Sequence, residues 1–569
     1  MPPPPAPTSP SPLAAELRTY DLTEANDQER AWKHLLTRFT DPRPPFNEFE
    51  TAYHHVYAKR DPQREGPAPA WFPAEKQATN AGAWMQQRKV KEYAELHRWS
   101  AQYRDEFWTR FLDAIRFPFQ TKPTAAREPQ SPTTRPTWLP GAVFNAADIC
   151  LRANVTKPAI VFASERNPTL QTWTYQDLSR LADQVAHGLD KVGLGERDRI
   201  ALYLPMTPES VAIYLGVIRS GRAAVGIADA SAAPDVEKRC RISNAKLAFT
   251  VDSYVRDGKE LKVYDKAKAA NAPPTIVLPS EPGGSTTPLR PTDKTWKEFL
   301  PAPKSYRSKP RTANDETNIL FSSGTTKDPK AIVWTHATPI KCLADSYFHQ
   351  DVQPDDVLSW PTSFGWMMGP WLTYASLGHG ATMALYNGSP LVAGFGRFIQ
   401  DAKVTMLGVV PKIVKAWRSA TSMEPFDWSR IRRFSSTGET SDPDDMLYLM
   451  WLGGVKPIIE YCGGTEIGGG YITGTMVQPA APASFTTAAM GLDFLILDDD
   501  GKPTNRGEVA ILPPSLGLSN DILNYDHAKE YYHDFFRGPK GQTLRRHGDQ
   551  LERLGRDYFR HHGRMDDMI

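Results

Sequence analysis

Small hydroxyl residues, one glycine and two lysines are concentrated in residues 321–330, Phe-Ser-Ser-Gly-Thr-Thr-Lys-Asp-Pro-Lys. Gly324 lets the backbone approach a ligand closely, and Lys330 closes the stretch with a compact positive charge. The hydroxyl groups on either side of Gly324 can donate hydrogen bonds to phosphate oxygens; they belong to Ser322, Ser323, Thr325 and Thr326. The stretch predicts a polyphosphate-binding loop. It is not a Walker-type loop, because the spacing is not G-x-x-x-x-G-K-[ST] and no glycine precedes Lys330.

Four further motifs follow this loop along the chain. They are Gly438-Glu439-Thr440, Tyr461-Cys462-Gly463-Gly464-Thr465-Glu466, Arg546-His547-Gly548-Asp549 and Gly563-Arg-Met-Asp-Asp567. In this order the motifs resemble those of the acyl-adenylate-forming superfamily, which includes acyl-CoA synthetases, luciferases and peptide-synthetase adenylation domains. Each motif alone has an ordinary alternative: a surface loop, a turn or solvated charge. The ordered set favours the superfamily.

The resemblance implies roles for individual residues. Thr465 would donate to the α-phosphate of ATP, Glu466 would help to hold Mg²⁺, and Asp549 would accept hydrogen bonds from the ribose hydroxyls. Thr465, Glu466 and Lys330 are the implied catalytic residues, and Asp566 is the implied hinge. The implied ATP and AMP contacts are Ser322, Ser323, Gly324, Thr325, Thr326, Lys330, Gly438, Glu439, Thr440, Glu460, Tyr461, Cys462, Gly464, Thr465, Asp549 and Arg564.

The implied chemistry has two steps. A carboxylate is a poor acyl donor because its leaving group would be oxide. In the first step its oxygen attacks the α-phosphorus of ATP and pyrophosphate leaves, so that AMP becomes the leaving group of the acyl-adenylate. A thiol, that of CoA, then attacks the acyl-adenylate and expels AMP. ATP, Mg²⁺ and CoA are therefore the predicted cofactor and co-substrates, and a small-molecule carboxylic acid is the predicted substrate.

Two residues depart from the motifs of the superfamily. Lys327 stands where most members have glycine, which would cost about 1 kcal/mol or more if that position needs a positive φ. The alternative is that Lys327 adds a contact to phosphate. His547 replaces the usual threonine, and we expect this change to be tolerated because Asp549 carries the ribose contact.

Other segments resemble plant peroxisomal acyl-activating enzymes and acetoacetyl- and acetyl-CoA synthetases; they are residues 138–145, 226–233, 365–368 and 385–390. The implied acyl pocket consists of Trp366, Met367, Met368, Thr437 and Gly463. Acetyl-CoA synthetases have a tryptophan at the position of Gly463, so its absence predicts a medium-length or aryl-substituted acid. On this hypothesis Gly463→Trp would shift preference toward acetate.

The fold class expected is α/β: layered α/β subdomains with a small β-barrel-like subdomain. Residues 175–189 have a helical stripe with Thr174 as cap, residues 199–204 and 223–227 are predicted strands, and Pro208 is predicted to begin a helix. The predicted organisation is a Pro-rich tail (1–12), a helical extension (13–120), a Pro/Thr-rich connector (121–140), the AMP-binding domain (141–565) and a hinge (566–569). A C-terminal lid is expected to be absent, which would impair turnover.

Composition excludes several function classes. The net charge is +2, because 67 Lys and Arg residues are nearly balanced by 65 Asp and Glu residues, which argues against a nucleic-acid surface. The four cysteines lack metal-ligand spacing and predict a reduced intracellular protein. Residues 357–396 carry no charged side chain, but prolines and glycines divide them into runs too short for a membrane span. A peroxisomal or cytoplasmic location is expected. Two alternatives stay open: a domain that loads a carrier protein, and a non-catalytic nucleotide-binding protein.

Overall fold

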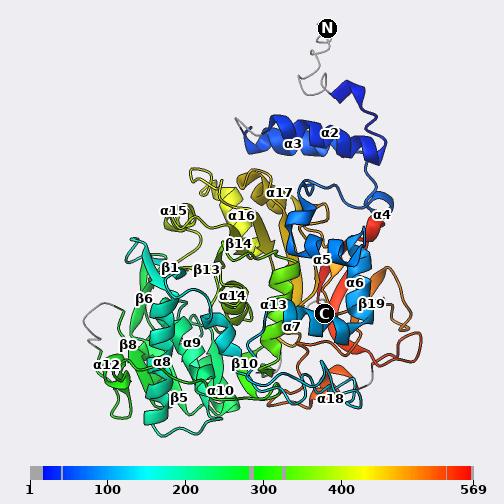
Figure 1. Cartoon of the computed structure of the whole chain (residues 1–569). Helices are drawn as coiled ribbons and strands as arrows, with labels where there is room; N and C mark the ends of the chain where they lie inside the picture. The colour runs from blue at the N-terminus through cyan, green and yellow to red at the C-terminus, as the bar shows by residue number, and fades with distance from the viewer. Residues whose placement is uncertain (1–16, 40–42, 281–286, 323–327, 534, 565–569) are drawn as a thin grey trace.

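The structure is a computed structural model that describes residues 17–39, 43–280, 287–322, 328–533 and 535–564 (Figure 1). The described residues form three larger sheets, and a separate two-stranded hairpin pairs β6 (Ser253–Arg256) with β7 (Lys259–Lys262). The α/β class predicted above is confirmed. No helix in the described ranges has the length and apolar character needed to cross a membrane.

The first large sheet is mainly parallel and has seven strands. In spatial order they are β11 (Ala331–Thr335), β10 (Glu316–Phe321), β4 (Ala223–Ile227), β3 (Arg199–Tyr203), β5 (Leu247–Val251), β8 (Thr275–Leu278) and β9 (Lys294–Thr295). Its associated helices are α8 (Tyr175–Lys191), α9 (Pro208–Arg219), α10 (Ala233–Ser243), α11 (Val263–Ala269) and α12 (Trp296–Phe299). Strands β3, β4 and β5 are almost wholly buried, which explains their near-continuous apolar sequences.

Local signals predicted the starts of two helices correctly. The Thr174 hydroxyl accepts from the Asp177 N–H, and Asp177 in turn caps Thr174, so α8 begins with a capping box. Thr207 caps α9 in the same way, and Pro208 occupies its first turn. The predicted strands at 199–204 and 223–227 correspond to β3 and β4.

The second large sheet has nine strands and carries most of the motifs. In spatial order they are β18 (Thr487–Ala488), β17 (Gly469–Thr473), β16 (Ile458–Gly464), β15 (Arg433–Ser436), β14 (Met406–Val409), β12 (Val357–Ser359), β13 (Thr382–Asn387), β1 (Pro158–Ser164) and β2 (Gln171–Thr174). Strands β16 through β1 in this order run parallel. The helices in this part of the chain are α13 (Thr338–Phe348), α14 (Met368–Leu377), α15 (Ala393–Asp401), α16 (Pro411–Ala420) and α17 (Pro443–Leu452).

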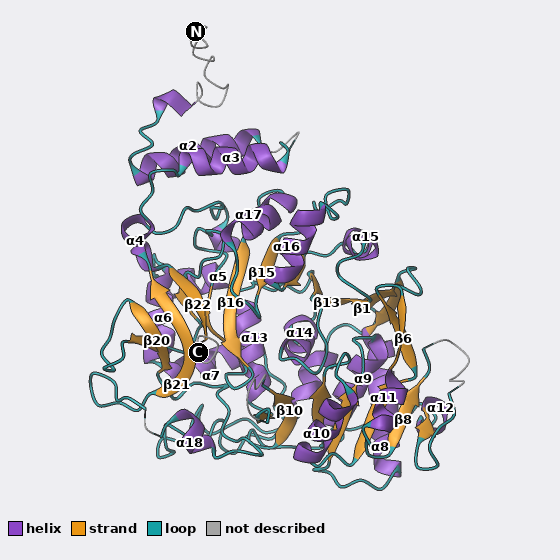
Figure 2. Ribbon diagram, turned by 180° about the vertical axis from the view of Figure 1, so that it is seen from behind, coloured by secondary structure: helices purple, strands orange, loops and turns teal. Residues whose placement is uncertain are grey.

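The third sheet is small and antiparallel, with the order β19 (Phe494–Leu497), β20 (Arg506–Ile511), β21 (Arg545–Arg553) and β22 (Phe559–Arg564). Figure 2 shows it on the same side of the molecule as β16. Over the described residues it is an open sheet, so the expected barrel-like closure is not seen. Two short helices flank its strands, α18 (His527–Tyr531) and the 3₁₀ turn η4 (Gly555–Asp557).

The N-terminal region is helical in its described residues. Its helices are α2 (Ala25–Arg38), α3 (Phe46–Val56), α4 (Pro62–Glu65), α5 (Asn80–Arg88), α6 (Tyr93–Gln102) and α7 (Arg104–Ala114), with 3₁₀ turns η1 (Leu17–Thr19) and η2 (Lys76–Ala78). Helices α2 and α3 lie beyond α17, and α5 packs against α13 (Figure 1). The N-terminal region therefore packs against α13 and α17, two helices from the part of the chain that forms the nine-stranded sheet.

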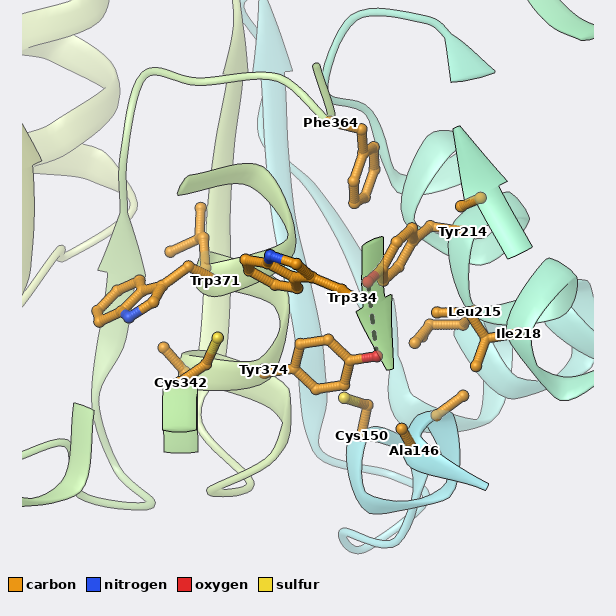
Figure 3. Packing of buried hydrophobic residues seen from close by; sticks show 14 of the residues in the cluster. Ala146, Cys150, Tyr214, Leu215, Ile218, Trp334, Cys342, Phe364, Trp371 and Tyr374 are labelled. Atoms are coloured by element: carbon orange, nitrogen blue, oxygen red, sulfur yellow. Dashed lines mark hydrogen bonds between the residues drawn. The ribbon is translucent and has the colours of Figure 1, made fainter. Parts of the chain in front are cut away.

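The largest core lies where helices of the two large sheets meet, beside the 3₁₀ turn η3 (Ala146–Leu151). Figure 3 shows Tyr214 of α9 and Tyr374 of α14 pointing toward each other, with hydroxyl oxygens 3.5 Å apart and Cys150 beside them. The Trp371 indole of this core donates to the Tyr461 hydroxyl at 3.1 Å. The Trp334 indole donates to the carbonyl of Thr465 at 2.7 Å. The core thus fixes the backbone of the Tyr461–Glu466 motif.

Two motif glycines permit a close approach between β4 and the loop before α14. A Cβ atom on Gly226 would lie 2.0 Å from the carbonyl oxygen of Phe364, and one on Gly365 would lie 1.9 Å from the Ala228 nitrogen. Real Cβ atoms do not come so close to backbone atoms, so any side chain would push these segments apart.

Gly226→Ala is therefore expected to lower the free energy of unfolding by about 1–3 kcal/mol, the usual cost of overpacking a core. Urea denaturation measures it. Gly474→Ala is the matched control, because its Cβ would have its nearest neighbour at 3.6 Å. Equal stabilities of the two variants would contradict the close-packing explanation.

Candidate functional site

The predicted phosphate loop connects the antiparallel strands β10 and β11. The Ser322 N–H donates to the Lys330 carbonyl at 3.1 Å and closes the connection. Lys330 Nζ lies 2.7 Å from Glu530 of α18, an ion pair that the sequence did not indicate. Ser323, Gly324, Thr325, Thr326 and Lys327 lie outside the described residues.

The loop 437–440 follows the carboxyl end of β15. Gly438 has φ +98°, a conformation that strains other residues, so glycine is required here. Glu439 pairs with Lys412 at 3.2 Å. The Thr440 hydroxyl lies 3.1 Å from Nδ1 of His561, which joins this loop to β22 of the third sheet.

The Tyr461–Glu466 motif forms the end of β16 and the turn after it. The Tyr461 hydroxyl donates to Asp345 at 2.6 Å, and Asp345 forms a fully buried ion pair with Lys341. A Cβ on Gly464 would lie 2.6 Å from the Glu466 carboxylate, so the missing side chain leaves the space that this carboxylate occupies. The Cys462 thiol approaches Asp549 of β21 at 3.4 Å.

His547 lies between two buried carboxylates. Its Nδ1 is 3.3 Å from Glu466 Oε1, and its Nε2 is 3.1 Å from Asp549 Oδ2. Burial alone would lower the pKa of His547, but Asp549 and Glu466 outweigh it and raise the pKa to about 9. Burial alone would raise the pKa of Glu466, but His547 lowers it to about 2; the pKa of Asp549 is likewise held well below its usual range. An imidazolium therefore joins the predicted metal and ribose carboxylates at neutral pH.

The pKa of Glu460 is shifted in the opposite direction from that of Glu466. Its side chain is buried, and its Oε2 accepts from the Ser441 hydroxyl at 2.9 Å. Burial outweighs this hydrogen bond and raises its pKa to about 8. Glu460 therefore carries a proton at neutral pH and can donate a hydrogen bond, which an ionised carboxylate cannot do.

The predicted acyl-pocket residues have different environments. Trp366 is 56% exposed and Met368 is buried, while Met367 and Thr437 are half-buried. A Cβ on Gly463 would lie 2.0 Å from the Gly469 carbonyl oxygen of β17. Close strand contact thus explains this glycine without reference to acid size, and Gly463→Trp would displace β17. A shift of this variant toward acetate would therefore not depend on the acyl pocket alone, and the acyl pocket stays a prediction.

Three functional-site neighbours were missed from the sequence. His547 was expected to be a tolerated replacement, but it contacts both key carboxylates. His561 is outside every motif, yet its Nε2 lies 3.5 Å from Asp549 Oδ2. Glu530 holds Lys330 from a helix 200 residues later in the chain. The sequence offered a signal only for His547, as a departure from the usual threonine of the ribose motif.

Arg564, the last of the predicted nucleotide contacts, is the final residue of β22 in the third sheet. Arg564 Nε lies 4.0 Å from Asp549 Oδ1, and its guanidinium donates to the carbonyl of His547 at 3.3 Å. Asp566, the predicted hinge, lies outside the described residues.

Comparison with known proteins gives the same family along most of the chain. Probable acyl-activating enzyme 17, peroxisomal, from Arabidopsis thaliana is 40% identical, over 95% of this chain and 78% of the relative. Hexanoyl-CoA synthase from Cannabis sativa is 38% identical, over 95% of this chain and 79% of the relative. The structure matches acetoacetyl-CoA synthetase from Streptomyces lividans with a TM-score of 0.80 at 25% identity, over 88% of this chain and 80% of that chain.

These matches do not support the expected absence of a C-terminal lid or the expected impairment of turnover. The predicted resemblance to acyl-activating enzymes and acyl-CoA synthetases is confirmed. Residues 150–516 match the family model described as AMP-binding enzyme. With this match and relatives of up to 40% identity among those described, the chain belongs to the AMP-binding enzyme family.

Proposed function

We propose that this chain is an AMP-forming acid–CoA ligase, which converts a carboxylic acid and ATP into an acyl-adenylate and then transfers the acyl group to CoA. One observation carries the proposal: the loop after β15 meets β22 through Thr440 and His561, and the end of β16 meets β21 through Cys462 and Asp549. Crevices beyond the carboxyl ends of parallel strands are where ligands bind in open α/β sheets.

The roles follow from the chemistry of each side chain. Asp549 is ionised and accepts hydrogen bonds from the ribose hydroxyls, with Arg564 beside it. Thr465, with its backbone held by Trp334, donates to the α-phosphate while the acid oxygen attacks the phosphorus. Lys330 exchanges its Glu530 partner for phosphate oxygens. Ser322, Gly438, Glu439, Thr440, Glu460, Tyr461, Cys462 and Gly464 line the nucleotide, with the predicted loop residues Ser323, Gly324, Thr325 and Thr326.

The chain's residues fit Mg²⁺ as part of the ATP complex. Glu466 supplies one ionised carboxylate, which is the usual protein contribution when phosphate oxygens provide other ligands. The ion would neutralise charge on the phosphates during adenylation. Glu466 must then turn part of its carboxylate away from His547.

The acid is proposed to be of medium length or aryl-substituted. Support comes from the name of the hexanoyl-CoA synthase relative and from the flexible side chains of Met367 and Met368 near Trp366. A peroxisomal location is proposed because two Arabidopsis relatives carry that location in their names.

The direct test incubates the chain with ATP, Mg²⁺, CoA and one of three acids: acetate, hexanoate or an aryl-substituted butyrate. We expect acid-dependent formation of AMP and an acyl-CoA, faster with the two larger acids. Acid-dependent ADP instead of AMP, or no thioester with any acid, would contradict the proposed reaction. Faster turnover of acetate would contradict only the proposed acid size.

Asp549→Asn tests the ribose contact. An amide loses the charge-assisted hydrogen bonds, worth about 1.5–3 kcal/mol, so AMP affinity should fall roughly 10- to 100-fold by calorimetry. Asp557→Asn is the control on a neighbouring turn, because that side chain is 71% exposed and pairs only with Arg553 among its described ion pairs. Thermal unfolding is followed in parallel. Unchanged AMP affinity in a folded Asp549→Asn variant would contradict the assignment.

A further inference from the structure

Three side chains of the types that bind zinc lie close together beside the nucleotide motifs. They are the Cys462 thiol from β16, the Asp549 carboxylate from β21 and the His561 imidazole from β22, and one ligand atom of each lies within 4.8 Å of the other two. Cys462 Sγ lies 3.4 Å and His561 Nε2 lies 3.5 Å from the same carboxylate oxygen, Asp549 Oδ2. Asp549 is buried, and the side chain of His561 is 13% exposed.

The two separations from Asp549 Oδ2, 3.4 Å to Cys462 Sγ and 3.5 Å to His561 Nε2, are close to those between ligands of a tetrahedral zinc ion. With Zn–S near 2.3 Å and Zn–O or Zn–N near 2.0–2.1 Å, neighbouring ligand atoms stand about 3.3–3.5 Å apart. Thiolate, imidazole and carboxylate are all zinc ligands, whereas Mg²⁺ and Ca²⁺ favour oxygen donors alone. Three protein ligands leave a fourth position for water.

Two further side chains lie behind these ligands. His547 Nε2 lies 3.1 Å from Asp549 Oδ2 and Nδ1 lies 3.3 Å from Glu466, so its imidazole stands behind the ligating carboxylate. The Thr440 hydroxyl lies 3.1 Å from His561 Nδ1 and can accept its N–H when Nε2 binds metal. The Gly563 N–H, 3.3 Å from the same Nδ1, loses its acceptor in that tautomer. Burial and Asp549 raise the pKa of the Cys462 thiol, and a bound divalent ion reverses this by taking the thiolate.

We propose that Cys462, Asp549 and His561 form a zinc site that overlaps the nucleotide site, so that Zn²⁺ and AMP exclude each other. The metal site rests on the three converging ligands, and the competition rests additionally on the proposed ribose role of Asp549. Zinc is then an inhibitor of the enzyme, distinct from the Mg²⁺ that accompanies ATP.

Cobalt replaces zinc as a spectroscopic probe. The metal-free 569-residue chain is titrated with Co²⁺, and we expect thiolate-to-cobalt charge-transfer absorption with tetrahedral d–d bands. Zn²⁺ should abolish both signals, and excess Mg²⁺ should leave them. Cys462→Ser should lose the charge-transfer band, and His561→Gln should weaken cobalt binding at least tenfold. Cys240→Ser, a cysteine on α10, is the control and should keep the band.

The outcomes separate the metal site from the proposed function. No charge-transfer band, or a band that survives both in Cys462→Ser and in His561→Gln, overturns the zinc site. AMP should raise the Co²⁺ concentration needed for half-saturation. If AMP has no such effect while Asp549→Asn weakens AMP binding, the competition is overturned and the ribose contact stands. If neither AMP nor Asp549→Asn has its expected effect, the ribose assignment fails.

Discussion

Replacement of His547 by glutamine is expected to lower the free energy of unfolding by about 3–5 kcal/mol at neutral pH, the usual cost of removing one partner from a buried ion pair. His547 is the cation between Glu466 and Asp549, both less than one-tenth exposed. Glutamine keeps a similar size and can still donate, but it leaves the two carboxylates without that charge. Urea denaturation of the nucleotide-free chain measures the difference.

His562→Gln is the matched control for this prediction. His562 pairs with one carboxylate, Glu552, and its side chain is 29% exposed, so the same substitution should cost less than about 1 kcal/mol. The deficit of His547→Gln should also shrink in acid, since protonation of Glu466 and Asp549 removes the buried negative charge. Equal effects of the two substitutions would show that the imidazolium of His547 does not stabilise the pair of carboxylates.

Glu460→Gln is expected to stabilise the chain, and more strongly as pH rises to about 8. The usual pKa of a glutamate is 4.5, and burial raises that of Glu460 to about 8. Between these values the folded state holds a proton that the unfolded state releases, so this group makes stability fall with rising pH. Above pH 8 the loss in free energy of unfolding levels off at about 5 kcal/mol, because each unit of pKa difference between the folded and unfolded states corresponds to about 1.4 kcal/mol.

Glutamine resembles the protonated acid and does not titrate, so its stability curve should lack this decline. The measurement is the midpoint of urea unfolding from pH 5 to pH 9 for both chains. Glu552→Gln is the control with opposite sign: despite partial burial, His562 lowers the pKa of Glu552, so that carboxylate stabilises the fold above the usual glutamate pKa. Parallel pH curves for the original chain and Glu460→Gln would contradict the raised pKa.

Much of the fold was predictable because its signals are local. The capping residues Thr174 and Thr207, the apolar strand at 199–203 and the start at Pro208 depend on neighbours only a few residues away. The family was predictable from five motifs in a fixed order. Their backbone roles are also local in part, as the positive φ of Gly438 shows.

Contacts between distant segments were not predictable. Lys330 was expected to face phosphate, but its partner Glu530 comes from α18. Gly463 suggested room for a medium-length or aryl-substituted acid, whereas the backbone of β17 occupies the position that its side chain would take. Such contacts depend on strand register and on the packing of whole sheets, which no short pattern encodes.

Motif order and apolar periodicity are properties of the chain, so the family and the α/β class could be predicted without the structure, and the nucleotide contacts stay predictions. The structure was needed to show that His547 lies between Glu466 and Asp549 and that Cys462 and His561 meet at that same carboxylate. Strand β16 pairs within the nine-stranded sheet, whereas β21 and β22 pair in the third sheet. These side chains meet because the two sheets pack together, and no local pattern encodes that packing.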